Sequence, residues 1–438
     1  MRVVIFTHSL ISDWNHGNAH FLRGVASELK ARGHQLHILE PRDGWSLQNL
    51  LADSGSSAVE AFETAFPDLR SRFYDLSTLD LDRELAGADL VLVHEWNSHD
   101  LVRRIGSHRA RHGSYVLLFH DTHHRSVTDR DAMARYDLTH YDSVLAYGNV
   151  IREIYRAEGW KDKVWTWHEA ADTRVFYPRR AVARDQDRGQ TNLSLTANRH
   201  PAADGSLKWT DPSVPGVSGT LRGDVVWIGN WGDDERADEI DEFLIRPVRE
   251  LGLRACVYGV RYPRAALEKL AQAGIEYAGW LPNYRVPEVF AQYRVTVHIP
   301  RRPYAGRLRG IPTIRPFEAL ACGIPLISAP WDDCEHLFTP GEDYLVARDG
   351  AEMAAHLRAL LADPALAAGM AARGLRTIRA RHTCAHRVDE LLNIYESLHH
   401  ADRLLWFESG VRLLERSGDL LPGDHPCAPR TRPSGDLL

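Results

Sequence analysis

The sequence predicts an α/β protein of two successive domains, each built around a doubly wound parallel sheet. Three observations favour this class. The chain has 438 residues, more than one hydrophobic core usually organises. A buried strand, a polar loop, a helix and a second strand follow one another at the N-terminus, and the same order returns from residue 224. The composition, 44% hydrophobic and 26% charged, is typical of a soluble globular protein.

The N-terminal segment carries the first such unit. Val3–Phe6 is a fully apolar strand, and a polar loop over 8–17 separates it from a helix predicted over 18–32. A dehydrogenase-type dinucleotide fold is the alternative, but its first loop requires G-x-G-x-x-G, and this loop contains only Gly17. Glu40 follows the second strand as that fold requires. Only one of two features is therefore present, and we set this alternative aside.

A run of polar residues, His120–Arg125, follows the strand predicted over 115–119. The end of a parallel strand is where ligands bind, and histidine can carry a proton because its pKa lies near working pH. We therefore expect at least one of these side chains to face a ligand. A metal site is an alternative, although three histidines and an aspartate within five residues cannot easily face one ion. Plain surface polarity, in a chain with 23 histidines, also stays open.

The most informative segment is Gly310–Ser328, with the sequence GIPTIRPFEALACGIPLIS. Thr313 is placed to cap a helix that Gly323 ends. The N-terminus of such a helix presents unpaired amides and a positive dipole to an anion, typically a phosphate. Glu318 lies one turn further on, where its carboxylate can accept hydrogen bonds from both hydroxyls of a ribose. The segment therefore predicts a nucleoside diphosphate site, and the alternative is a helix surface pair between Arg315 and Glu318 worth roughly 0.2–0.5 kcal/mol.

The run RPFEALACGIPLIS resembles the donor-site signature of GT-B glycosyltransferases of the family 4 type, and most closely the spore-maturation-type glycosyltransferases. Upstream, Asp172, Phe176 and Pro178 stand at the spacing of the D-x-x-x-F-x-P motif that precedes the interdomain linker in those enzymes. The family usually carries a second glutamate, eight residues before Glu318, which contacts the transferred sugar. Here that position is Gly310, so the resemblance leaves the sugar and some catalytic detail open.

The resemblance implies a GT-B architecture and transfer of a sugar from a nucleotide-diphosphate sugar, with retained anomeric configuration and no metal or cofactor. The expected donor-binding residues are Gly229, Asn230, Gly279, Trp280, Leu281, Arg301, Thr313, Ile314, Arg315 and Glu318. The expected catalytic residues are His120, Asp121, His123 and Arg302, and the expected acceptor contacts are His16, Gly17, Asn18 and His124. The acceptor is left open among carbohydrate, lipid, protein and small molecule.

The same reading divides the chain into five segments. They are a Rossmann-like acceptor domain over 1–178, a linker or insert over 179–223, a Rossmann-like donor domain over 224–385, a cross-over helix over 386–402 and a tail over 403–438. Two other functions stay open. A sugar-nucleotide epimerase would use the same fold, and a non-catalytic protein would bind the sugar nucleotide without turning it over.

Charge and cysteine content limit which binding partners and which cellular compartment are expected. The net charge of −6 argues against nucleic acid, which normally meets a basic surface. The five cysteines show neither a zinc-site spacing nor a disulfide framework, so a reducing cytoplasm is expected. No segment approaches the run of about 18 apolar residues that spans a membrane. Peripheral membrane contact stays open.

Overall fold

The computed structural model describes residues 1–179 and 221–399. By its packing the chain divides into a unit of Met1–Leu391 and a second unit of Leu392–Leu438, and the description below concerns the first. Most of the predicted insert and all of the predicted tail lie outside the described residues.

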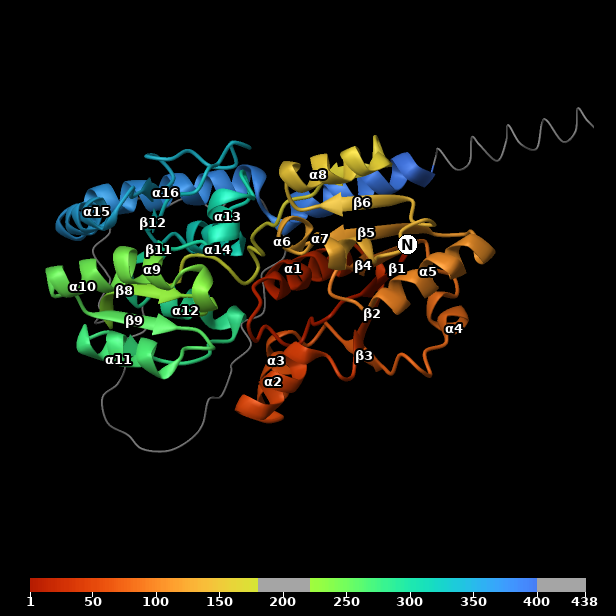
Figure 1. Cartoon of the computed structure of the whole chain (residues 1–438), viewed down its shortest axis with the longest axis horizontal. Helices are drawn as coiled ribbons and strands as arrows, with labels where there is room; N and C mark the ends of the chain where they lie inside the picture. Colours follow the sequence, from red (N-terminus) through yellow and green to blue (C-terminus); the bar gives the residue numbers. More distant parts are fainter. Residues whose placement is uncertain (180–220, 400–438) are drawn as a thin grey trace, which may run out of the picture. The chain divides into compact units, whose positions relative to one another are not determined.

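Seven parallel strands among the described residues form the first sheet, in the order β3-β2-β1-β4-β5-β6-β7 (Figure 1). The order runs outward from β1 and β4, the doubly wound arrangement in which ligands bind at the carboxyl ends beside the switch point. The strands are β1 Arg2–Phe6, β2 Gln35–Pro41, β3 Ser71–Tyr74, β4 Leu90–His94, β5 Val116–Asp121, β6 Ser143–Ala146 and β7 Val164–Thr166. The helices are α1 Asn18–Ala31, α2 Trp45–Ser54, α3 Ser57–Ala65, α4 Leu81–Leu85, α5 His99–His112, α6 Arg125–Thr128, α7 Arg130–Ala134 and α8 Asn149–Tyr155.

The second sheet repeats this plan with six described strands in the order β10-β9-β8-β11-β12-β13. The strands are β8 Gly223–Ile228, β9 Ala255–Tyr258, β10 Glu276–Tyr277, β11 Tyr293–His298, β12 Leu326–Ser328 and β13 Leu345–Val346. The helices are α9 Ala237–Ile240, α10 Arg246–Leu251, α11 Arg264–Gln272, α12 Val286–Phe290, α13 Arg302–Gly306, α14 Ile314–Cys322, α15 Gly350–Ala362 and α16 Pro364–Arg381. The predicted fold class, two doubly wound parallel sheets, is confirmed.

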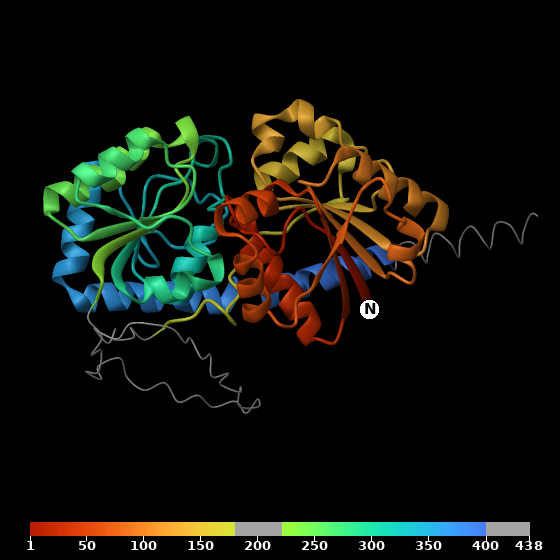
Figure 2. The ribbon, with the colours of Figure 1, turned by 90° about the horizontal axis from the view of Figure 1, so that it is seen from below.

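The strand sequences explain why both sheets are central. Val3–Phe6 in β1 and Val225–Ile228 in β8 are buried along their whole length, as a parallel strand requires when helices cover both faces. Figure 2 shows helices on both sides of each sheet. Each sheet has its own large apolar cluster, so the repeated strand–helix order in the sequence corresponds to two cores.

Two differences from the sequence-based expectation matter for the site. The strand predicted over 115–119 continues to Asp121, because β5 keeps pairing with both neighbours, His120 with His94 and Asp121 with Ala146. The segment 45–87, which has no clear period, supplies α2, α3, β3 and α4.

The last residues of the first unit contact the segment that follows β7. Residues 384–391 are helical. The Trp167 indole donates a hydrogen bond to the Arg387 carbonyl (2.8 Å), and the Arg387 guanidinium donates to the His168 carbonyl (2.9 Å). The boundaries at 178, 224 and 385 stay predictions. No helix among the described residues combines the length and the apolar character needed to cross a membrane.

Candidate functional site

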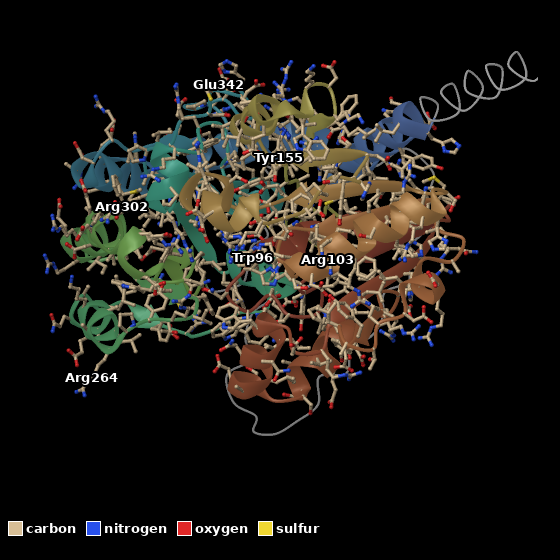
Figure 3. The ribbon with its side chains drawn as sticks, turned by 45° about the vertical axis from the view of Figure 1, so that its right-hand side comes forward. Trp96, Arg103, Tyr155, Arg264, Arg302 and Glu342 are labelled. Carbon is tan, nitrogen blue, oxygen red and sulfur yellow. The ribbon has the colours of Figure 1, made fainter. Side chains whose placement is uncertain are left out.

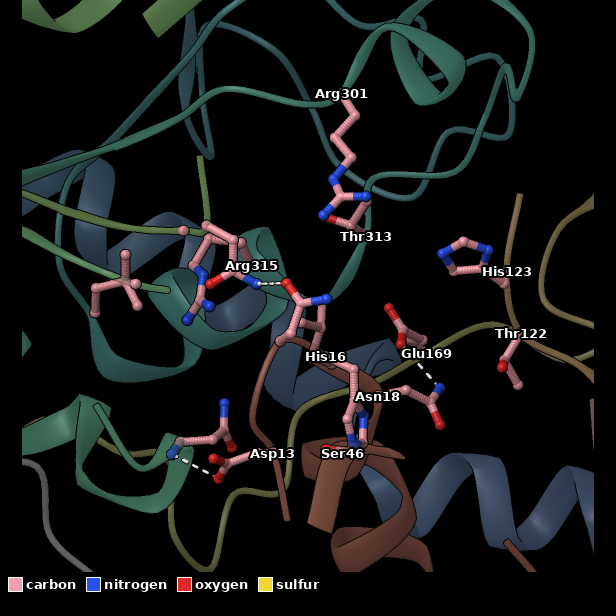
Figure 4. A pocket seen from close by; sticks show the side chains of 18 of the residues that line it. Asp13, His16, Asn18, Ser46, Thr122, His123, Glu169, Arg301, Thr313 and Arg315 are labelled. Atoms are coloured by element: carbon pink, nitrogen blue, oxygen red, sulfur yellow. Dashed lines mark hydrogen bonds between the residues drawn. The ribbon is translucent and has the colours of Figure 1, made fainter. Parts of the chain in front are cut away.

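A cavity of about 620 Å³ opens where loops from both sheets meet. Its lining residues follow the carboxyl ends of strands in the first sheet and of β8, β9 and β11 in the second, together with the start of α14. Figure 4 shows the two groups of side chains facing each other, with Asp13, His16 and Asn18 on one side and Arg301, Thr313 and Arg315 on the other. The doubly wound topology therefore places both sets of strand ends around one pocket.

Three arginines concentrate positive charge on the wall that comes from the second sheet. Arg236, Arg301 and Arg315 all line the pocket. Burial, together with the neighbouring positive charges of Arg301 and Arg315, lowers the pKa of Arg236 to about 9. A guanidinium whose charged form is disfavoured in this way is stabilised when an anion arrives. This wall is therefore built to receive one.

The N-terminus of α14 faces the same wall. Thr313, Ile314 and Arg315 line the pocket as expected of donor-binding residues. Thr313 occupies the N-cap position, but the expected capping bond is absent: its side chain accepts no hydrogen bond from the helix and its φ is +62°. The first amides of the helix are thus not satisfied by the cap side chain. They are available to an anion that the arginines attract.

Glu318 is placed differently from the prediction. Its carboxylate is fully buried and does not line the pocket, so the structure contradicts the expected direct contact with ribose. Burial raises the pKa of Glu318, but Arg315, His20 and Asn283 outweigh this effect and lower it. The physical reason is that all three donors reach the carboxylate from different elements, and they leave it no face toward the cavity.

His20 connects Glu318 to the second motif of the sequence. Its Nδ1 lies 3.0 Å from Glu318 Oε1, and its Nε2 accepts a hydrogen bond from the backbone amide of Asp172 (2.8 Å). The ring of Phe176 packs against His20, with 3.9 Å between centroids. The two motifs, 146 residues apart, thus meet through one imidazole that sits just behind the pocket.

The turns after β8 and β10 are placed largely as predicted. Gly229, Asn230, Trp280 and Leu281 line the pocket, whereas Gly279 does not. The Asn230 side chain donates to Asn15 Oδ1 (2.7 Å) and accepts from the Val260 amide (2.9 Å).

The predicted residues of the first sheet fall into two groups. His16, Gly17, Asn18, His123 and His124 line the pocket. His120 and Asp121 do not, because β5 continues through them and both side chains are fully buried. The pocket geometry therefore gives neither of them a place at the reacting atoms.

The contacts of these two buried side chains are internal. His120 Nδ1 lies 3.0 Å from His94 Nδ1, and burial lowers the pKa of His120 to about 3. Asp121 accepts hydrogen bonds from Ser126 and Tyr155, and burial raises its pKa. We assign both to the support of the strand end.

Arg302 lies outside the pocket, contrary to the prediction. Its guanidinium pairs with Asp238 (2.8 Å) and Glu239 (2.7 Å) on α9. Figure 3 shows it at the edge of the ribbon, well away from Trp96, which lines the pocket. The reason is that α13 begins at Arg302 and turns its side chain outward, while Arg301 before it keeps an extended conformation.

Several residues that line the pocket were not predicted from the sequence: His8, Trp96, Glu169, Trp227, Arg236 and His298. Arg236 offered a signal, because it stands just before the helix that follows the glycine turn of β8. Glu169 offered a weaker one, because it precedes the D-x-x-x-F-x-P motif by three residues.

The missing second glutamate has a steric explanation. Gly310 has a φ of +85°, and a Cβ atom built there would lie 2.4 Å from Cγ of Glu335. The Glu335 carboxylate is held by the Asn149 amide (2.7 Å) and His168 (2.8 Å). A glutamate at 310 would have to displace this buried group, and Glu335 itself does not line the pocket.

Known structures share the fold of this chain over most of its length. Sucrose-phosphate synthase from Thermosynechococcus elongatus superposes with a TM-score of 0.55 at 16% identity, covering 92% of this chain and 100% of that one. HepE of Anabaena, in complex with UDP and glucose, superposes with a TM-score of 0.57 at 13% identity, covering 91% of this chain and 100% of that one. The fold is GT-B. An α-glucosyltransferase in complex with UDP and a 13-mer DNA gives 0.57 at 12% identity, covering 90% of this chain and 99% of that one.

Sequence comparison covers a smaller part of this GT-B chain. Residues 236–393, which include the arginine wall and α14, match the family described as glycosyl transferase-like. The search of curated proteins finds no match to the sequence.

Glu169 makes the stability of this GT-B chain depend on pH. Burial raises its pKa to about 8 from 4.5, against a hydrogen bond from Asn18. Between these values the folded protein holds a proton that the unfolded chain has lost, so this group's contribution falls as pH rises. We expect Glu169→Gln to gain stability over the wild type from pH 5 to pH 8, by up to about 1.4 kcal/mol per pH unit. Denaturant unfolding at several pH values measures the difference, and a constant difference would contradict the assignment.

Gly17 allows the first loop to approach α14. A Cβ atom at Gly17 would lie 2.5 Å from Cγ2 of Ile314. We expect Gly17→Ala to lower the free energy of unfolding by about 1–3 kcal/mol, because the overlap must displace Ile314 and the helix start. Gly369→Ala is the matched control: its Cβ meets only ordinary contacts inside α16, and it should stabilise by roughly 0.5–1 kcal/mol. Thermal unfolding of both variants tests this, and equal behaviour would show that the loops do not meet as described.

Proposed function

We propose that the protein is a glycosyltransferase that takes a sugar from a nucleotide-diphosphate sugar. The observation that carries the proposal is the wall formed by Arg236, Arg301, Arg315 and the uncapped start of α14. Three guanidinium groups and free helix amides fit a diphosphate, which carries charge on several oxygens. The family match over 236–393 and the UDP named in the neighbouring complexes support the same reading.

The chemistry follows from where charge develops. As the bond between the sugar C1 and the diphosphate oxygen breaks, negative charge grows on the leaving group, and preorganised cations lower the barrier. We assign this role to Arg301 and Arg315, with Arg236 behind them. Because arginines supply the balancing charge, we propose that no divalent ion is required. Unchanged turnover in a chelator would support this, and activity that depends on added Mg²⁺ or Mn²⁺ would refute it.

The stereochemical outcome remains a proposal from the signature. Retention of the anomeric configuration is expected, and the NMR coupling constant of the anomeric proton in the product decides it. The second sugar-contacting glutamate of the signature is replaced by Gly310. We propose that Glu169 takes its place as the carboxyl group nearest the transferred sugar, because Asp13, the other acidic residue of the described lining, is paired with Arg23 (2.9 Å).

The direct test is a calorimetric titration with UDP, GDP, ADP and TDP, followed by incubation with the corresponding sugar nucleotides. The proposal expects one nucleoside diphosphate to bind and one sugar nucleotide to lose its sugar, to water or to an added acceptor. Release of an isomerised sugar still attached to the nucleotide would instead show an epimerase. Binding without any turnover would show a non-catalytic protein.

A further inference from the structure

The wall opposite the arginines has a different composition. The lining residues that the first 179 residues contribute include His8, His16, His123 and His124, together with Trp45 and Trp96. None of the described lining residues from this part of the chain is lysine or arginine. Its two acidic members are Asp13, which is paired with Arg23, and Glu169. A negatively charged ligand would therefore find no cation on this wall.

The histidines of this wall are neutral. Burial lowers the pKa of His16 and of His124 to about 4, and it lowers those of His8 and His123 well below the usual value. Positive neighbours are part of the cause of these shifts, Arg301 and Arg125 for His124 among them. At neutral pH these imidazoles therefore hydrogen-bond without attracting an anion.

The hydrogen-bond network also assigns the tautomers of two of them. The ring of His16 donates from Nε2 to the Ser12 carbonyl (2.7 Å), so Nδ1 is left as an acceptor. The Thr128 hydroxyl donates to the His124 carbonyl (3.1 Å), so it must accept from His124 Nδ1 (2.7 Å), and Nε2 is left as an acceptor. Both of these nitrogens are buried and without a partner. Such an atom is satisfied only by a group that donates, such as a hydroxyl, and not by a phosphate or carboxylate oxygen.

Trp96 adds an apolar surface beside these acceptors. Its side chain is 44% exposed, lies 5.0 Å from the His123 ring centroid and is backed by the Arg125 guanidinium at 4.1 Å. The charge of Arg125 is balanced by Glu95 (2.7 Å). An aromatic ring that lines a pocket offers a large apolar surface on which a ligand can pack.

From this wall we propose that the acceptor is an uncharged, hydroxyl-rich molecule, a sugar or a glycan, which donates hydrogen bonds to His16 and His124 and packs on Trp96. The inference rests on the proposed function, since it concerns the acceptor side of the same pocket. An acceptor with a phosphate next to the reacting hydroxyl, as in a lipid phosphate or a nucleic acid, would place its charge against two imidazole nitrogens that only accept hydrogen bonds. The described lining residues of this wall include no lysine or arginine to balance that charge. Although one structural neighbour is described in complex with DNA, this wall lacks the cations that phosphates require.

Saturation-transfer NMR on the full chain in the presence of UDP tests the inference. The probes are methyl glycosides of the common hexoses and pentoses, the matching hexose phosphates, a short single-stranded DNA and vesicles containing phosphatidylglycerol. We expect saturation of the neutral glycosides, with His16→Phe and Trp96→Ala each reducing it about ten-fold while the UDP signal persists. Tyr177→Ala, which removes an exposed aromatic ring that does not line the pocket, is the control and should change neither signal.

The outcomes distinguish a wrong acceptor class from a wrong donor site. If UDP is saturated but the phosphates, the DNA or the vesicles compete better than every neutral glycoside, the acceptor inference is overturned. The same holds if no neutral glycoside is saturated, or if His16→Phe and Trp96→Ala bind it as well as the wild type. Absence of a nucleotide signal from the wild type with UDP, and likewise with GDP, ADP and TDP in its place, would refute the donor site, and with it the proposed function.

Discussion

Replacing Arg301 with alanine is expected to weaken UDP binding by about ten- to a hundred-fold, whereas replacing its neighbour Arg302 leaves binding unchanged. Charge-assisted hydrogen bonds to a phosphate contribute roughly 1.5–3 kcal/mol each, which corresponds to that range. Arg301 lines the pocket and has only a loose ion pair with Glu235 (3.4 Å). Arg302 is already paired with Asp238 and Glu239 outside it.

The two arginines form a matched pair for measurement. They are adjacent in sequence and carry the same charge, so a general loss of positive potential would affect both variants alike. Titration calorimetry with UDP, repeated at two salt concentrations, separates a local contact from long-range attraction. Equal losses in both variants, or a loss confined to Arg302→Ala, would contradict the pocket assignment and restore the catalytic role that the sequence predicted for Arg302.

Glu318→Ala is expected to lower the free energy of unfolding by about 3–5 kcal/mol, the cost of removing one partner from a buried ion pair. The variant removes the buried carboxylate to which Arg315, His20 and Asn283 all donate. Because Asn283 and Arg315 line the pocket, we also expect UDP affinity to fall, although Glu318 itself does not touch the cavity.

The stability that Glu318 contributes is expected to decrease in acid. The three donors lower the pKa of Glu318 below 4.5 in spite of burial, so its contribution is complete above the unfolded value and is lost as pH falls through the folded value. Denaturant unfolding should therefore show the difference between wild type and Glu318→Ala shrinking in acid. Glu268→Ala, which removes an exposed ion pair with Arg264 (2.8 Å), serves as control and should cost less than about 1 kcal/mol. A Glu318→Ala variant as stable as this control would show that the carboxylate is not buried among donors.

Much of the fold could be predicted because it depends on local patterns. The helix predicted over 18–32 is observed as α1 Asn18–Ala31, and Gly33 takes a positive φ of +82° just after its end. The fully apolar strands β1 and β8 identified the centre of each sheet. The segment 45–87 could not be assigned, because its short helices lack a sustained apolar period and are held by tertiary packing.

The site was predictable only in part. The start of α14 and the turn after β8 could be placed on the pocket wall because glycines and a capping position mark them locally. Which of the two adjacent arginines, Arg301 or Arg302, faces the cavity depends on where α13 begins. The residues that flank them in the sequence do not determine this. Whether β5 stops before or after His120 depends on how far β4 and β6 pair with it.

The sequence by itself determined that this chain has two parallel-sheet cores and that a helix start in the second half is suited to an anion, because apolar periodicity and helix-terminating residues act within a few positions. Only the tertiary structure decided which charges surround that anion site. Arg236 and Glu169 reach the pocket from segments whose local signals do not show that they line it, and Glu318 is drawn away from it by His20, a residue 298 positions earlier. Contacts over such distances depend on how the sheets and helices pack, which the pattern of neighbouring residues does not encode.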